Sequence, residues 1–112
     1  MREGDMVVEV RWVANPFRGD KFEEAWRQHA ASVLRFGATE WQFLRSTDDK
    51  LSFIQMAVFP DKLSWERYWY SEEISEARAD ATGLYQVPLL PLFYKVNGSG
   101  ELAAEPAASA AG

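Results

Sequence analysis

The sequence contains no cysteine, a single histidine, no strongly basic segment and no long hydrophobic run. The absence of cysteine excludes disulfide bonds, thiolate catalysis and zinc sites that use cysteine ligands. A lone histidine without a clustered partner does not form a metal site, so we predict no metal. With 12 basic and 17 acidic residues, the net charge is −5, and nucleic acid is not an expected partner.

Hydrophobic stretches that would direct or anchor the chain are also missing. Residues 1–12 lack the apolar segment of a secretory signal, and no apolar run approaches the length of a membrane span. We therefore expect a soluble, cytoplasmic protein that does not bind membranes. From Asn97 onward the composition shifts to Ala, Gly, Ser, Glu and Pro. This shift predicts one folded domain over residues 1–96 and a low-complexity tail over residues 97–112.

Aromatic residues, by contrast, are abundant: they make up 14% of the chain and include five tryptophans. They concentrate in "WERYWYSEE", residues 65–73. On a helical wheel, Trp65, Tyr68 and Trp69 share one arc, whereas Arg67 and Tyr70 lie on the other side. A stripe of this kind usually packs in a core, but bulky rings can also line a pocket. Both interpretations stay open from the sequence.

The first third of the chain predicts a strand followed by a helix. Residues 6–14 alternate, with Met6, Val8, Val10 and Trp12 on one face, while the other face also carries valine. Residues 20–36 then show helical spacing, with an apolar stripe that runs from Phe22 through Trp26 and His29 to Val33. Asp20 with Glu23 matches a capping box, and Gly37 is placed to end the helix.

The remainder predicts a hairpin, a second helix and a last strand. The segments 40–46 and 51–59 are apolar and flank "TDDK", which is typical of a β-hairpin loop. Asp61 is placed to cap a second helix, Ser71 to restart or kink it, and Gly83 to end it. In residues 85–96, Pro88 and Pro91 leave only the last five or six residues for a strand.

The element order is therefore β-α-β-β-α-β, which predicts an α+β, ferredoxin-like fold with a four-stranded antiparallel sheet. Both helices would cover one face of this sheet. The other face, which carries Val7 and Val13, would remain apolar in part and uncovered. A second copy of the chain usually hides such a face, so we predict a homodimer.

This order, together with the segment "VFPDKLSWERYWYSEEISEARA", resembles the dimeric α/β-barrel superfamily, and within it the antibiotic biosynthesis monooxygenase-like branch. The resemblance covers residues 6–96. It implies a cavity in each protomer between the sheet and its helices, able to hold a small aromatic ligand without any cofactor. The candidate lining residues are Trp12, Trp26, Gln55, Phe59, Trp65, Tyr68, Trp69 and Tyr85.

Cofactor-free, quinone-forming oxygenases of the superfamily use an Asn, a Trp, a Tyr and a later Arg. Gln55, Phe59, Trp65 and Arg78 align with these four positions, so the resemblance preserves only the arginine in kind. Haem-degrading members pair an Asn after the first strand with a helical Trp and a later His. Asn15 matches the first, but residues 60–96 contain no histidine, so haem degradation is not expected.

Three residues are candidates for catalysis. His29 lies on the apolar stripe of the first helix and would serve as a general base, although an apolar face often holds a histidine that merely bonds a carbonyl. Arg78 would stabilise a substrate anion, or it is solvated or paired within its own helix. Asn15 is a candidate through the resemblance and, more simply, a turn residue before Pro16.

Three functions therefore remain open. The first is a cofactor-independent monooxygenase acting on a small aromatic, polyketide-like phenol. The second is an isomerase or cyclase with His29 as its base, which would use the same cavity without O₂. The third is a non-catalytic dimer that binds a small molecule or has a structural role.

Overall fold

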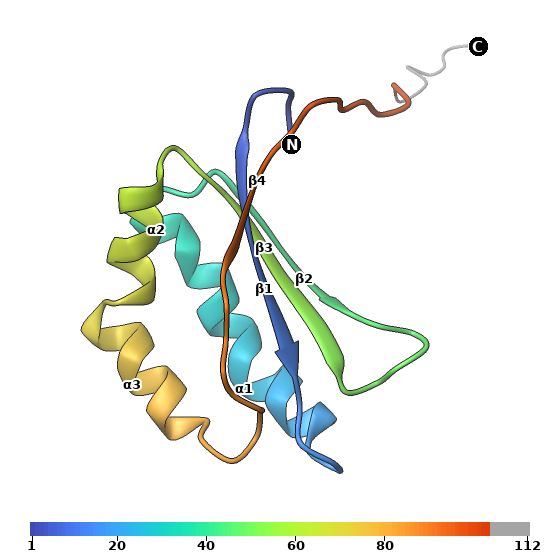
Figure 1. The fold of residues 1–112 in the computed structure, drawn as a ribbon, viewed down its shortest axis with the longest axis vertical. Coiled ribbons are helices and arrows are strands. Elements are labelled where there is room, and N and C mark those ends of the chain that lie inside the picture. The colour runs from blue at the N-terminus through green and yellow to red at the C-terminus, as the bar shows by residue number, and fades with distance from the viewer. Residues whose placement is uncertain (104–112) are drawn as a thin grey trace, which may run out of the picture.

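The computed structural model, which describes residues 1–103, has a four-stranded sheet with its helices on one face (Figure 1). All neighbouring strands are antiparallel, and their spatial order is β2-β3-β1-β4. The α+β, ferredoxin-like arrangement predicted from the sequence is confirmed. In chain order the elements are β1 Met6–Val13, α1 Gly19–Ala31, the 3₁₀ helix η1 Ser32–Phe36, β2 Glu40–Arg45, β3 Ser52–Phe59, α2 Lys62–Trp69, α3 Glu72–Asp80 and β4 Leu92–Lys95.

The core lies between the sheet and the helices. Val8, Val10 and Trp12 alternate along β1 on the face that the helices cover, and all three are buried. Because directly paired residues share a face, Phe53 and Gln55 of β3 join them, opposite Trp12 and Val10 respectively. The alternation seen in the sequence therefore selects the face that packs against the helices.

Two helix starts follow their sequence signals closely. The Asp61 carboxylate accepts a hydrogen bond of 2.8 Å from the backbone N–H of Ser64 and caps α2. The Ser71 hydroxyl accepts one from the N–H of Ile74 and caps α3. The predicted restart at Ser71 thus divides the second helical region into α2 and α3.

The predicted cap of the first helix is wrong. α1 begins at Gly19, and the residue before it, Arg18, makes no capping hydrogen bond through its side chain. The Asp20 and Glu23 carboxylates instead accept hydrogen bonds from Arg45 at 2.8 and 2.9 Å. A cation from the hairpin has therefore replaced the local capping box. The helix also ends earlier than predicted, since residues 32–36 tighten into η1 before Gly37 ends it with a φ of 101°.

The face of the sheet opposite the helices carries both charged and apolar side chains. Val7 and Val58 are buried there, while Val13, Leu44 and Tyr94 are each more than 40% exposed.

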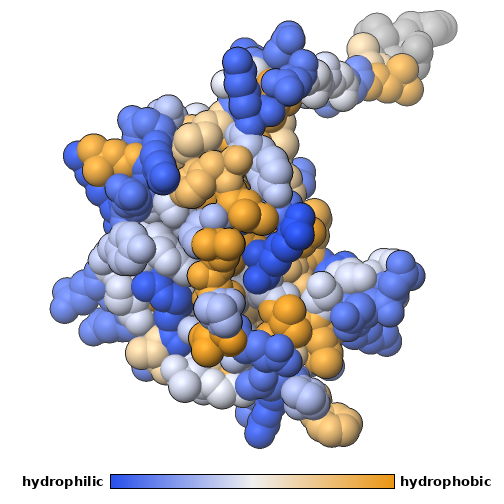
Figure 2. All heavy atoms as spheres, viewed as in Figure 1, coloured by the Kyte–Doolittle hydropathy of each residue, from blue (hydrophilic) through white to orange (hydrophobic). Residues whose placement is uncertain are grey.

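Figure 2 shows hydrophobic side chains gathered over β4 and over the segment that leads to it. Within residues 1–103, no helix is both long and apolar enough to cross a bilayer. Residues 104–112 of the predicted tail lie outside the described residues.

Candidate functional site

A buried amide forms the polar centre of the core. The Oε1 atom of Gln55, on β3, accepts hydrogen bonds from the indole N–H of Trp12 at 3.1 Å and of Trp26 at 2.9 Å. Its Nε2 atom donates to the Tyr68 hydroxyl at 3.0 Å, and that hydroxyl donates to the His29 carbonyl at 2.8 Å. Three elements, β1, α1 and α2, therefore converge on one side chain of β3.

The chemistry of the partners fixes the direction of this network. An indole N–H can only donate, so the oxygen of the Gln55 amide must face the two tryptophans and its nitrogen must face Tyr68. Gln55 is 2% exposed, and Trp12, Trp26 and Tyr68 are fully buried. Burial raises the pKa of Tyr68 far above its ordinary value, so its hydroxyl remains protonated and acts as a donor.

Aromatic rings fill the space around the amide. The Trp12 ring centroid lies 4.6 Å from that of Trp26 and 6.0 Å from that of Trp69, and Trp69 stacks on Trp65 at 5.1 Å. Phe59 meets Trp65 edge to face at 5.8 Å. Trp12 and Trp26 are fully buried and Trp65 is 3% exposed. The aromatic stripe of α2 thus packs as core around Gln55 in this structure.

Arg78 lies at the α3 end of the same cluster. Its guanidinium carbon is 4.2 Å from the centroid of the Trp69 ring, and it donates a 2.8 Å hydrogen bond to the Trp69 carbonyl. Burial lowers the pKa of Arg78, although it remains a cation at neutral pH. Tyr85 covers this end of the cluster. Its ring packs edge to face against Trp12 with centroids 5.0 Å apart, and its hydroxyl donates a hydrogen bond to the Arg78 carbonyl.

No family model and no curated protein matches the sequence. Solved structures do match. SnoaB, a cofactor-independent oxygenase from Streptomyces nogalater, superposes with a TM-score of 0.72 at 16% identity, over 86% of this chain and 96% of that chain. A candidate antibiotic biosynthesis monooxygenase from Nitrosomonas europaea superposes with a TM-score of 0.70 at 18% identity, over 80% of this chain and 95% of that chain. NE2512 from the same organism, a protein of unknown function, superposes with a TM-score of 0.72 at 15% identity, over 93% of this chain and 100% of that chain.

The chain has the fold of the antibiotic biosynthesis monooxygenase-like proteins. The resemblance drawn from the sequence is therefore confirmed at the level of the fold. Because identity stays below 20% in these three comparisons, the likeness carries neither activity nor substrate to this chain.

Within this fold, the side chains of His29 and Asn15 are not among the hydrogen-bond partners of the Gln55 amide, which are Trp12, Trp26 and Tyr68. The His29 side chain is half-buried and lines a surface groove of about 480 Å³ together with Leu34, Arg35 and Glu73. Its backbone carbonyl accepts the Tyr68 hydrogen bond of the Gln55 network, and its ring packs on Trp26 with centroids 5.2 Å apart. The Asn15 side chain donates to the Gly83 carbonyl at 2.7 Å and so ties the end of β1 to the loop after α3. Their predicted catalytic roles stay predictions.

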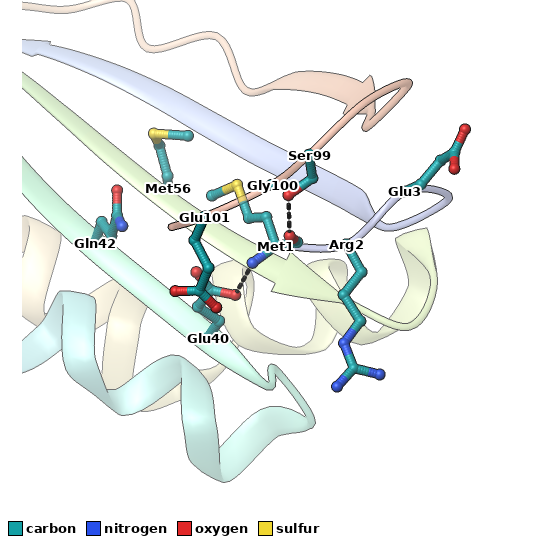
Figure 3. A pocket seen from close by; sticks show the side chains of 9 residues that line it. All are labelled: Met1, Arg2, Glu3, Glu40, Gln42, Met56, Ser99, Gly100 and Glu101. Carbon is teal, nitrogen blue, oxygen red and sulfur yellow. Dashed lines mark hydrogen bonds and ion pairs between the residues drawn. The ribbon is translucent and has the colours of Figure 1, made fainter. Parts of the chain in front are cut away.

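Another surface hollow, of about 500 Å³, lies on the open face of the sheet, between β2 and the two ends of the described chain (Figure 3). The Met1 ammonium pairs with Glu40 at 2.6 Å across it, and the Ser99 hydroxyl donates to the Met1 carbonyl. Gln42, Met56 and Glu101 also line this hollow. It lies on the opposite face of the sheet from the Gln55 amide, which faces the helices.

Two aromatic residues of the edge strand lie beside the core but were not predicted as site residues. Trp41 and Phe43 of β2 face α1, are partly buried against the core, and line a small hollow between β2 and α1. The sequence does show aromatic residues alternating at positions 41 and 43, which places them on one face of a strand. Any hairpin strand can show this pattern, so it does not by itself indicate that the two residues line a hollow.

Proposed function

We propose that the chain is a cofactor-independent monooxygenase that acts on a small phenol at the Gln55 centre. One observation carries this proposal: two indole N–H donors, from Trp12 and Trp26, converge on a single buried oxygen atom. Donors that converge on one oxygen in a water-excluded site are the arrangement that stabilises a developing oxyanion. In this structure, the amide oxygen of Gln55 occupies the place that a substrate oxygen would take.

The reaction needs no redox cofactor. The substrate loses a proton to solvent and becomes a phenolate or enolate, which transfers one electron to O₂. The resulting radicals combine into a carbon-bound peroxide anion, which takes a proton back from solvent and then loses water to leave a quinone. One oxygen atom enters the product, the other leaves in water, and the substrate supplies all the electrons. The protein contributes positioning, exclusion of water and stabilisation of the anion.

Each residue then has a defined part. Trp12 and Trp26 donate to the substrate oxygen once the Gln55 amide has rotated away, and Tyr68 accepts a hydrogen bond from the amide nitrogen in the resting position. Arg78 lends positive charge at the edge of the cluster, through the ring of Trp69. His29 faces the outer groove, so it would act as a base only for a substrate that extends to that groove.

Oxygen uptake tests this function. The full chain is mixed with 1-naphthol or anthrone, and O₂ consumption, quinone absorbance and tryptophan fluorescence are followed together. Trp26→Phe keeps a ring but removes one donor, and we expect kcat to fall by about 100-fold. Tyr68→Phe should also lower turnover, whereas Tyr70→Phe is the matched control, because Tyr70 is 72% exposed and outside the network. No O₂ uptake above the uncatalysed rate with either substrate would refute the proposal.

A non-catalytic role is the second candidate, and a specific observation favours it. The rings around Gln55 are almost fully buried, and the amide oxygen, both indole N–H groups and the Tyr68 hydroxyl are all paired. Such a centre is also what a stable, purely structural core would contain. Saturable fluorescence quenching without O₂ uptake would indicate a binding protein, and the absence of both would leave the structural role.

We also propose that two copies pack through the open face of the sheet. Val13, Leu44 and Tyr94 expose apolar surface there beside the buried Val7 and Val58. A partly apolar sheet face of this kind is stabilised when a second copy covers it. The molar mass in solution, from light scattering after size exclusion, tests this directly: a monomer over the whole concentration range would refute it.

A further inference from the structure

A hollow of about 130 Å³ opens between α1 and the edge strand β2. Trp41, Phe43 and Phe53 supply its aromatic lining, and Glu23, Arg27 and Arg45 stand at its rim. β2 is the outermost strand on this side of the sheet (Figure 1). The hollow therefore lies at the sheet edge, beside α1. Nothing in the Gln55 network uses these side chains.

We infer that this hollow is a binding site for one ring of a neutral phenol. Its size is the first reason, because an apolar cavity of about 150 Å³ is known to hold benzene. Its lining is the second, since Trp41 and Phe43 are partly exposed and present ring surface to an incoming ring, while the buried Phe53 stacks behind Phe43 with centroids 5.5 Å apart. A fused polycyclic compound would place a single ring inside and leave the others outside.

The rim selects the polar group of the ligand. Arg45 is held by Asp20 and Glu23 and lies over the Phe53 ring, with its guanidinium carbon 5.0 Å from the centroid. Arg27 is largely exposed and pairs with Glu23 at 3.2 Å. A guanidinium donor thus stands beside a carboxylate acceptor. A hydroxyl both accepts and donates a hydrogen bond, so a phenol fits this rim better than a hydrocarbon or a charged ring.

The hollow lies one layer of rings away from the Gln55 amide. Phe43 is directly opposite Gln55 in the pairing of β2 with β3, so the two side chains share the face that meets the helices. Phe22 lies between the two regions. Its ring centroid is 6.2 Å from that of Phe43 and 6.3 Å from that of Trp26, on which it stacks. If the proposed oxygenase function holds, the hollow is the point at which its substrate first binds, but ring binding there does not depend on catalysis.

Indole N–H signals of the ¹⁵N-labelled full chain separate the two sites. Trp41 reports on the hollow, while Trp12 and Trp26 report on Gln55. Phenol is titrated, with cyclohexanol as the matched alcohol without an aromatic ring. We expect a saturable shift of the Trp41 signal with phenol, with a Kd on the order of 1 mM for so small a ligand, and a much smaller shift with cyclohexanol.

The outcomes distinguish this inference from the proposed function. A shift of Trp41 alone supports the hollow and gives no support to binding at Gln55. Shifts of Trp41 together with Trp12 and Trp26 support both. Equal responses to phenol and cyclohexanol overturn the inference, as does O₂ uptake with phenols while Trp41 remains unmoved; that last result would leave the oxygenase function intact.

A matched pair of variants completes the test. Phe43→Leu removes a ring from the hollow and keeps an apolar side chain, and we expect the Kd for phenol to rise about fivefold. Phe93→Leu makes the same change on β4, the opposite edge strand, and should leave the Kd unchanged. Thermal unfolding of both variants confirms that they remain folded. Equal Kd values in the two variants would place the phenol somewhere other than this hollow.

Discussion

Replacing Gln55 with leucine should destabilise the protein strongly, although the new side chain is apolar and similar in size. The change removes the acceptor of two indole N–H groups, those of Trp12 and Trp26, in a region with almost no exposure to water. Each buried donor left without a partner costs about 1–3 kcal/mol. Tyr68 still donates to the His29 carbonyl, so it adds little to the loss.

Leucine recovers about 1 kcal/mol through its apolar surface, which leaves an expected net loss of about 1–5 kcal/mol out of a typical 5–15 kcal/mol for a domain. Urea unfolding followed by tryptophan fluorescence measures this loss, and Tm should fall by on the order of 10 °C. The control is Gln28→Leu, an exposed glutamine on α1, for which we expect a change within about 0.5 kcal/mol. A loss below about 1 kcal/mol for Gln55→Leu would refute the reasoning.

A double-mutant cycle between Gln55 and Trp26 measures how strongly the two side chains are coupled. In the wild type, Trp26→Phe removes a paired donor and leaves Gln55 with one acceptor interaction fewer. In the Gln55→Leu background it removes an orphaned donor, so part of the lost stability should return. The coupling between the two positions should therefore be clearly non-zero, about 1 kcal/mol or more. Additive effects would mean that the indole N–H is satisfied by water.

Three further results are expected. Because burial raises the pKa of Tyr68, the unfolded chain loses the Tyr68 proton at a lower pH than the folded chain does. The free energy of unfolding should therefore fall as pH rises above the ordinary tyrosine pKa of 10.0, by up to about 1.4 kcal/mol per pH unit. This fall should be shallower in Tyr68→Phe than in Tyr70→Phe. The Ser64 backbone N–H lowers the pKa of Asp61, so the cap stabilises α2 above the ordinary aspartate pKa and is lost in acid; Asp61→Ala should lower Tm at neutral pH while Asp61→Asn preserves most of it. Leu44→Glu on the open face should shift a dimer toward monomer in light scattering, whereas Leu34→Glu, similarly exposed on η1, should not.

Local signals in the sequence were sufficient for most of the fold. The alternation along β1 and the caps at Asp61 and Ser71 depend on residues at most three positions apart, and the structure has them where they were predicted. The cap at Asp20 failed for a nonlocal reason. Arg45 arrives from the hairpin, 25 residues away, and a charge-assisted pair displaces the local capping bond. The spacing of residues within the helix does not indicate that a residue from another element will bind the Asp20 carboxylate.

The site was predictable residue by residue but not as an assembly. Trp12, Trp26, Gln55 and Tyr68 were each singled out from periodicity or from the family resemblance. Their convergence depends on the register that sets Gln55 opposite Val10, and on side-chain rotamers that bring both indole N–H groups to one oxygen. Register and rotamers follow from tertiary packing, so the sequence alone could not distinguish a pocket lined by these rings from a core filled by them.

The polar centre is the feature that a purely apolar core would not need. An amide buried beside two tryptophans costs its desolvation, and hydrogen bonds only offset that cost. A core in which the amide and its indole donors were replaced together by well-packed apolar side chains would therefore be about as stable. A centre retained for structure alone should lose nothing but stability when Trp26 becomes phenylalanine. A centre that holds a substrate oxygen should lose turnover at temperatures where the variant is still fully folded. Measured on the same Trp26→Phe sample, the unfolding curve and the rate of O₂ uptake therefore assign the buried amide to the core or to chemistry.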